Sequence, residues 1–200
     1  MARFVVGVSG ASGIILALRI LKALGELGHA IELVITKEAL HTAAYELGKG
    51  FGTAAQLLKH LPNKVQEKIT LHPIHDVGAT ISSGSFLTDG MFIIPCSMAT
   101  LAAIATGLAD NALRRAADVT IKEKRRLVIV PREAPLSEIH LENMLRLARL
   151  GAVILPPTPA WYLRPTTLEE VEEVIVARAL DAMGVNHSLG KRWGEMSSAL

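Results

Sequence analysis

The sequence contains little cysteine and few aromatic residues, and neither positive nor negative charge is in large excess. Cys96 is the only cysteine in 200 residues, so an internal disulfide is excluded and a reducing compartment is favoured. The 21 Lys and Arg nearly balance the 19 Asp and Glu, which argues against a protein that coats a polyanion. The first residues have the composition of a β-strand and contain no signal-peptide cleavage pattern. We therefore expect a cytoplasmic protein.

One long run lacks charge entirely. Residues 90–109 contain no Lys, Arg, Asp or Glu, and twenty uncharged residues are enough to span a bilayer. However, Pro95 and Ser97 interrupt the run, and its second half is rich in Ala and Thr. We interpret it as a short buried strand over 91–95 and an Ala-rich helix over about 98–108. The alternative, a membrane span, rests on hydropathy alone.

Stretches of strand-like composition alternate with stretches of helical periodicity. Strands are predicted over 3–8, 30–36, 69–74, 91–95, 126–130 and 152–155. Helices are predicted over 14–27, 37–47, 98–108, 110–123 and 137–150, and a capping box at 167–170 begins a last helix to about 183. Residues 48–68 are punctuated by glycine and are assigned only in part. Because apolar strands that alternate with helices indicate a parallel sheet covered on both faces, we predict one α/β domain, residues 1–200, built as a three-layer sandwich.

The loop after the first predicted strand is rich in glycine. Residues 7–13 read Gly-Val-Ser-Gly-Ala-Ser-Gly, and a helix follows at once. Such a loop brings backbone amides and a helix N-terminus to a ligand, at the edge of the sheet where ligands bind. Its spacing fits neither the dinucleotide fingerprint nor a Walker A loop, and Thr36 stands where a NAD site has an acidic residue. The loop favours a mononucleotide or flavin phosphate, and the alternative is a turn that binds nothing.

Charged residues follow two other elements. Arg115, Asp118 and Lys122 fall on one face of a predicted helix, where they form either part of a site or a solvated ion-paired face. Arg132 and Glu133 follow a buried strand; an arginine there can bind a phosphate and a glutamate can serve acid–base chemistry. The alternative for this pair is a loop salt bridge.

Other chemistries are not supported. The sequence has no Asp-Asp-x-x-Asp cluster to hold magnesium and a diphosphate, and His72, His75 and Asp76 lack a second cluster to complete a zinc site. Cys96 lies in an apolar segment, which indicates a small buried residue more than a nucleophile. Residues 122–126 are basic but few and lack aromatic neighbours, so we expect no nucleic-acid partner.

Ordered blocks along nearly the whole chain resemble one family, the flavin prenyltransferases of UbiX type, formerly regarded as aromatic-acid decarboxylases. The blocks are residues 7–13, 82–85, 95–101, 115–118, 122–123, 131–136, 140–144, 159–162 and 192–193. The resemblance implies a flavodoxin-like or Rossmann-like fold and a dodecamer with FMN where subunits meet. It implies transfer of a dimethylallyl group from dimethylallyl phosphate to N5 and C6 of reduced FMN, without metal. The prenylated FMN would serve a partner decarboxylase of UbiD type.

The resemblance also implies roles for single residues. The FMN site would consist of Gly10, Ala11, Ser12, Thr36, Ser97, Met98, Ala99, Thr100 and Arg132. The substrate phosphate would be bound by Lys122, Tyr162 and Arg178, with Arg115 close by. The catalytic residues would be Ser12, Glu133, Lys122 and Arg115, with Ser12 near flavin N5 and Glu133 serving as acid and base at the leaving phosphate.

Three further positions bear on the resemblance. Glu46 is expected to reach a neighbouring subunit's site. Val77 stands where some members have a tryptophan that could stabilise an allyl cation, and Trp193 in the tail could take that part.

Two rival functions use the same fold. An FMN-dependent decarboxylase of the peptidyl-cysteine type needs a histidine in the helix after the second strand, where His41 is the one candidate. An FMN carrier without catalysis would leave Lys122, Glu133, Tyr162 and Arg178 without a role.

Overall fold

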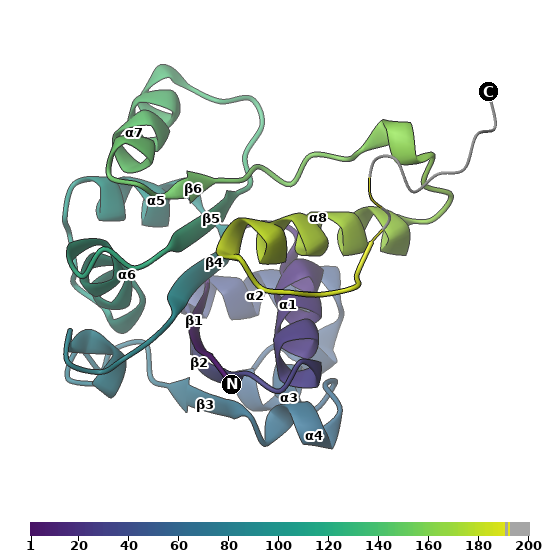
Figure 1. The fold of residues 1–200 in the computed structure, drawn as a ribbon, viewed down its shortest axis with the longest axis horizontal. Helices are drawn as coiled ribbons and strands as arrows, with labels where there is room; N and C mark the ends of the chain where they lie inside the picture. Colours follow the sequence, from purple (N-terminus) through teal and green to yellow (C-terminus); the bar gives the residue numbers. More distant parts are fainter. Residues whose placement is uncertain (191, 193–200) are drawn as a thin grey trace.

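The computed structural model describes residues 1–190 and 192, and its centre is a six-stranded sheet in the order β3-β2-β1-β4-β5-β6 (Figure 1). All neighbouring strands are parallel. The strands are β1 Arg3–Val8, β2 Ala30–Ile35, β3 Ile69–His72, β4 Gly90–Cys96, β5 Leu127–Pro131 and β6 Val153–Ile154. Every residue of β4 and β5 is buried, which explains why these strands read as continuous apolar runs.

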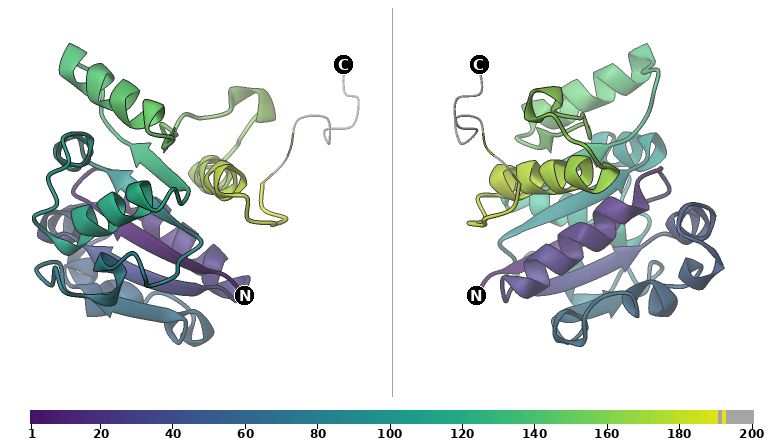
Figure 2. Two further views of the ribbon diagram at one scale, coloured as in Figure 1. Left: turned by 60° about the vertical axis from the view of Figure 1, so that its left-hand side comes forward. Right: turned by 90° about the vertical axis from the view of Figure 1, so that its right-hand side faces the viewer.

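Helices cover both faces of the sheet (Figures 1 and 2). The helices are α1 Ile14–Glu26, α2 Lys37–Glu46, α3 Ala54–Leu58, α4 Asn63–Gln66, α5 Met98–Ala105, α6 Ala112–Lys122, α7 Glu138–Arg149 and α8 Leu168–Met183, with 3₁₀ turns η1 Lys49–Phe51, η2 Thr80–Ser82 and η3 Trp161–Leu163. Successive residues of a strand point to opposite faces. Val6 packs in one core with α1 and α8, whereas Val5 packs in the other with α5, α6 and α7. The predicted three-layer α/β sandwich with a parallel sheet is confirmed.

Several element ends differ from prediction because polar side chains begin or end helices. β2 ends at Ile35, since Thr36 is the N-cap of α2 and its Oγ1 accepts a hydrogen bond from Ala39 N at 3.2 Å. α6 begins at Ala112, since Asn111 caps it. The capping box predicted for α8 is half formed: Thr167 accepts from Glu170 N, but the Glu170 carboxylate binds Thr166 N instead.

The uncharged run over residues 90–109 forms β4 and α5, as predicted, although the helix ends at Ala105. Within the described part of the chain, no helix is both long and apolar enough to cross a membrane.

Candidate functional site

A cavity of about 570 Å³ lies at the carboxyl ends of β1, β2 and β4. The chain runs outward from β1 to β3 on one side and from β4 to β6 on the other, so the strand order reverses between β1 and β4. This reversal is the place where open α/β sheets bind their ligands. The cavity brings together five of the nine residues expected to contact FMN: Gly10, Thr36, Ser97, Ala99 and Thr100.

Three helix N-termini converge on this cavity. Thr36, Ser97 and Asn111 all line it, and they are the N-caps of α2, α5 and α6. Each cap oxygen accepts a hydrogen bond from the amide three residues on, at 3.2, 3.3 and 3.0 Å. Since the N-terminus of a helix carries partial positive charge, three of them together favour an anion such as a phosphate.

Buried hydrogen bonds hold two of the cavity's loops together. Ser9 is fully buried; its hydroxyl donates to Pro95 O at 3.3 Å and accepts from Ser97 N at 2.8 Å. Ser97 Oγ in turn donates to Thr100 Oγ1 at 3.1 Å. The loop after β1 is thereby fixed against the turn after β4. Ser9 was not among the predicted site residues, because nothing in the sequence pairs it with residues almost ninety positions away.

The loop after β1 also packs closely against the start of α2. A Cβ atom on Gly10 would lie 2.5 Å from Glu38 Cβ. Glycine is therefore required at this position for the two segments to approach each other. Of the neighbouring loop residues, Ala11 is buried and Ser12 is partly buried, and the cavity lining includes neither.

The head of α1, where the sequence predicts a phosphate cradle, binds a side chain of the same chain. The Glu46 carboxylate accepts hydrogen bonds from Gly13 N at 3.0 Å and from Ile14 N at 2.9 Å. Gly13, the N-cap residue, has φ 98° and no side chain of its own to cap the helix. Within one copy, Glu46 therefore caps its own α1, and the helix N-termini that line the cavity are those of α2, α5 and α6.

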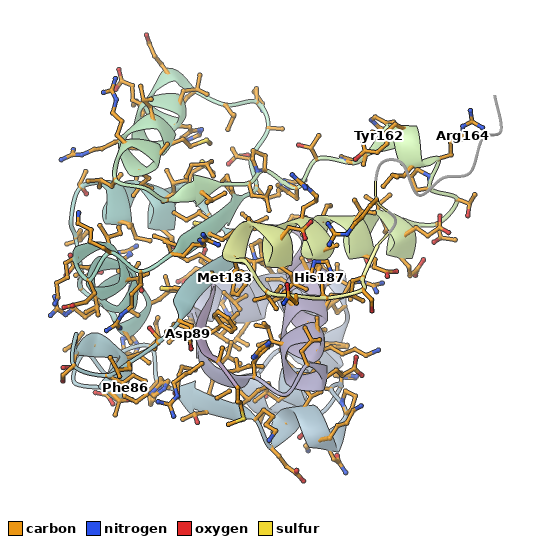
Figure 3. The ribbon with its side chains drawn as sticks, viewed as in Figure 1. Phe86, Asp89, Tyr162, Arg164, Met183 and His187 are labelled. Atoms are coloured by element: carbon orange, nitrogen blue, oxygen red, sulfur yellow. The ribbon has the colours of Figure 1, made fainter. Side chains whose placement is uncertain are left out.

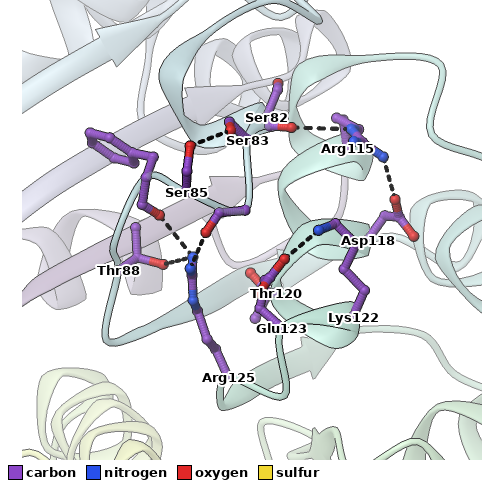
Figure 4. A network of polar contacts seen from close by, with 12 residues as sticks. Ser82, Ser83, Ser85, Thr88, Arg115, Asp118, Thr120, Lys122, Glu123 and Arg125 are labelled. Carbon is purple, nitrogen blue, oxygen red and sulfur yellow. Dashed lines mark hydrogen bonds and ion pairs between the residues drawn. The ribbon is translucent and has the colours of Figure 1, made fainter.

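The charged face predicted on α6 splits into two pairs (Figure 4). Arg115 Nη1 lies 2.6 Å from Asp118 Oδ2, while Arg115 Nε donates to Ser82 O at 3.2 Å. Lys122 pairs with Glu123 rather than with Asp118. The hydrogen bond from Lys122 lowers the pKa of the exposed Glu123 carboxyl. Neither Arg115 nor Lys122 lines the cavity.

The serine-rich loop beside α6 is fixed by Arg125 (Figure 4). Its guanidinium donates to Gly84 O at 2.6 Å, to Phe86 O at 2.9 Å and to Thr88 Oγ1 at 3.2 Å. A Cβ atom on Gly84 would collide with the Lys122–Glu123 pair. The block at residues 82–85 therefore positions the charged pairs of α6.

Four more predicted residues do not line the cavity: Arg132, expected to contact FMN, and Glu133, Tyr162 and Arg178, expected to act on the substrate phosphate. Arg132 and Glu133 are exposed in the loop after β5, where Glu133 Oε1 accepts from Ala134 N at 3.0 Å. Figure 3 shows Tyr162 at the end of the molecule away from α5 and α6. Arg178 is exposed on α8, 3.6 Å from Asp181 Oδ2. One copy of the chain therefore does not assemble the complete predicted site.

Asp181 holds a small polar cluster at the end of α8. Its carboxylate also accepts hydrogen bonds from Arg192 at 2.8 Å and from His187 Nε2 at 3.1 Å. Partial burial raises the pKa of Asp181, but these hydrogen bonds and charges outweigh it and hold the pKa below its usual value. Trp193 lies outside the described residues.

Three further residues from the sequence-based predictions, His41, Val77 and Met98, also have defined positions in the structure. His41 is exposed on α2 and does not line the cavity, and Val77 is 52% exposed. Met98 is buried in the core beneath α5. Among residues 1–190 and 192, no cluster of His, Cys, Asp and Glu is arranged to hold a metal ion.

The rest of the cavity wall consists of residues that the sequence motifs do not predict. Besides the five expected residues, its lining includes Lys37, Glu38, Ile74, His75, Asp110, Asn111, Leu113 and Arg114. These residues come from the heads of α2 and α6 and from the loop after β3. The Asp-Asn pair before a helix was the one available signal, because both residue types favour N-caps.

Comparisons with known proteins identify the family to which the chain belongs. Residues 1–179 match the model of the Flavoprotein family. The chain is 50% identical to flavin prenyltransferase UbiX of Chlamydia trachomatis, over 96% of this chain and 98% of that protein.

Solved structures extend the likeness to the fold. The crystal structure of AnUbiX in complex with FMN and dimethylallyl pyrophosphate superposes with a TM-score of 0.85 at 43% identity, covering 96% of this chain and 97% of that one. A dodecameric FMN-dependent UbiX-like decarboxylase from Escherichia coli O157:H7 gives 0.84 at 45% identity, covering 96% and 98%. With half of its residues shared with a UbiX enzyme over nearly its whole length, this chain belongs to the flavoprotein family and, within it, to the flavin prenyltransferases.

Proposed function

We propose that this chain joins the dimethylallyl group of dimethylallyl phosphate to N5 and C6 of reduced FMN, and that the product serves a UbiD-type decarboxylase. The observation that carries the proposal is the convergence of three helix N-termini on one cavity at the strand-order reversal. A relative with 43% identity was solved with FMN and dimethylallyl pyrophosphate together, which supports this pair of ligands. The single, buried thiol of Cys96 suits a reducing compartment, so we place the reaction in the cytoplasm.

The cavity suits FMN in size and charge. Its volume of about 570 Å³ falls within the range of roughly 300–1,000 Å³ common for small-molecule sites. We propose that Thr36 and the first turn of α5, from Ser97 to Thr100, hold the phosphate, and that Gly10, Ala11 and Ser12 follow the flavin from the loop after β1. FMN, when bound, supplies the electron-rich nitrogen and carbon that receive the prenyl group.

The chain's charged residues would handle the leaving phosphate. When the C–O bond of dimethylallyl phosphate breaks, its electron pair leaves with the phosphate, which would then carry additional negative charge. Lys122, Arg115 and Arg178 would neutralise that charge, and Glu133 would hold the proton that the phosphate requires. Tyr162 would bind the phosphate and help to exclude water. Arg132 would contact FMN.

These residues must come from more than one copy, because a single chain does not bring them to the cavity. We therefore propose a homo-oligomer in which loops of neighbouring copies complete each site. The Escherichia coli relative is dodecameric, which supports twelve copies.

One assay tests the function. The protein is mixed without air with reduced FMN and dimethylallyl phosphate, and the mass of the flavin is followed. We expect the flavin to gain one C5H8 unit, and an unchanged flavin mass would overturn the proposal. Glu133→Gln should slow this gain while the protein still retains FMN; Glu142→Gln, which changes an exposed carboxylate on α7, is the matched control.

A further inference from the structure

Arg114 lies in the wall of the cavity at the head of α6, and neither motif nor resemblance assigned it a role. Its Nη1 donates to both carboxylate oxygens of Asp110, at 2.8 and 3.0 Å. Its backbone N donates to Asn111 Oδ1 at 3.0 Å. The guanidinium is thereby fixed at the cavity rather than free to move in solvent.

The Arg114 side chain still has an unmet hydrogen-bonding need. Only 20% of the side chain is exposed, and its Nε is buried without a hydrogen-bond partner among the described residues. A buried donor on a charged group is unfavourable when it is left unpaired. An acceptor supplied by a ligand in the cavity would relieve this cost.

The surroundings of Arg114 select an anion as that ligand. The N-termini of α2, α5 and α6 face the same cavity, and Lys37 lines it as well. Two carboxylates also line the cavity: that of Asp110 is engaged by Arg114, and Glu38 is exposed to solvent. A planar guanidinium beside helix N-termini matches a phosphate group, which accepts several hydrogen bonds at once.

We propose that Arg114, oriented by Asp110, binds the phosphate of FMN and makes the chain prefer FMN over riboflavin. The inference rests on the proposed use of FMN and extends it to a residue of this chain. The phosphate of dimethylallyl phosphate has the same chemistry, so the experiment has to separate the two sources.

The test is a titration of the flavin-free protein with FMN and, separately, with riboflavin, followed by flavin fluorescence. Arg114→Gln should weaken FMN binding about tenfold or more and leave riboflavin binding unchanged, because a charge-assisted contact to phosphate is lost. Arg114→Lys keeps the positive charge but lacks the planar guanidinium, so its FMN affinity should lie between that of Arg114→Gln and that of the unchanged protein. Arg146→Gln on α7, outside the cavity, is the matched control and should bind as the unchanged protein does.

Several outcomes would overturn the inference. The first is an FMN affinity in Arg114→Gln equal to that of the unchanged protein. The second is an equal loss of affinity for FMN and for riboflavin. The third is a raised KM for dimethylallyl phosphate while the FMN affinity is unchanged. If Arg114→Gln does not fold, FMN affinity in Arg114→Lys equal to that of the unchanged protein overturns it as well. An unchanged protein that binds no FMN would refute the proposed function itself, which separates the two failures.

Discussion

Cys96 shows how burial decides the chemistry of a single residue. The residue is fully buried at the end of β4, and burial raises the pKa of its thiol to about 12. In the unfolded chain the thiol has its ordinary pKa, near 8.5. Because the folded value is the higher one, the thiol's contribution to stability is complete below about pH 8.5 and is lost as the pH rises above it.

We expect Cys96 to be inert toward iodoacetamide in the native protein at pH 8 and reactive in urea. The native thiolate fraction should be about a thousandfold smaller than that of a free thiol. Mass spectrometry of the alkylated protein measures the rate in both states. Rapid native labelling would show that Cys96 is an accessible nucleophile after all.

Gly10 carries a second expectation at the residue scale. A methyl group there would lie 2.5 Å from Glu38 Cβ, so Gly10→Ala must push the loop after β1 away from α2. We expect a loss of roughly 1–3 kcal/mol in the free energy of unfolding, measured in urea, and weaker FMN binding. Gly50→Ala, where the nearest atom is 3.9 Å away, should change stability by less than about 0.5 kcal/mol. Equal effects of the two substitutions would refute the close approach.

At the scale of elements, α1 depends on a cap from a distant helix. Glu46, at the end of α2, binds the amides of Gly13 and Ile14. Glu46→Ala should lower the free energy of unfolding by about 1 kcal/mol, as the loss of other helix caps does, while Glu142→Ala on the exposed face of α7 should not. Urea unfolding of both variants measures the difference. Unchanged stability in Glu46→Ala would show that this cap does not stabilise α1.

How well an element could be predicted depended on where its stabilising contacts lie. β1 and α8 were predicted closely, because an apolar run defines one and Thr167 with the left-handed Gly184 bounds the other. α3 and α4 were not, because helices of 5 and 4 residues are held by tertiary contacts, such as those of Val65 with α1, and not by their own periodicity.

The candidate site follows the same rule. The predicted order of strands and helices indicated where in the fold the site lies, and the motifs predicted the cavity residues that follow β1, β2 and β4. Asp110 and Arg114 are brought to the cavity by folding alone, and the contact from Ser9 to Ser97 spans 88 positions. Local patterns contain no signal for such pairs.

At the scale of the whole molecule, a single copy leaves large apolar side chains exposed on its surface. Ile139 is 67%, Trp161 74% and Leu168 68% exposed, and Glu133, Tyr162 and Arg178, proposed to act on the substrate phosphate, are exposed as well. Such surfaces suit contacts between copies. We expect sedimentation or light scattering to give the mass of twelve copies of the 21.4 kDa chain. A monomer that prenylates flavin at full rate would contradict the shared site.

A crystal structure of the protein with FMN tests the central claim most directly. The account predicts the flavin phosphate within hydrogen-bonding distance of the Thr36 hydroxyl and the first amides of α5, with the Arg114 guanidinium on its other side. Density for FMN in a second cavity, of about 260 Å³ and lined by Leu163 and the first turns of α8, would contradict it. A phosphate bound at the head of α1 with Glu46 displaced would contradict it as well.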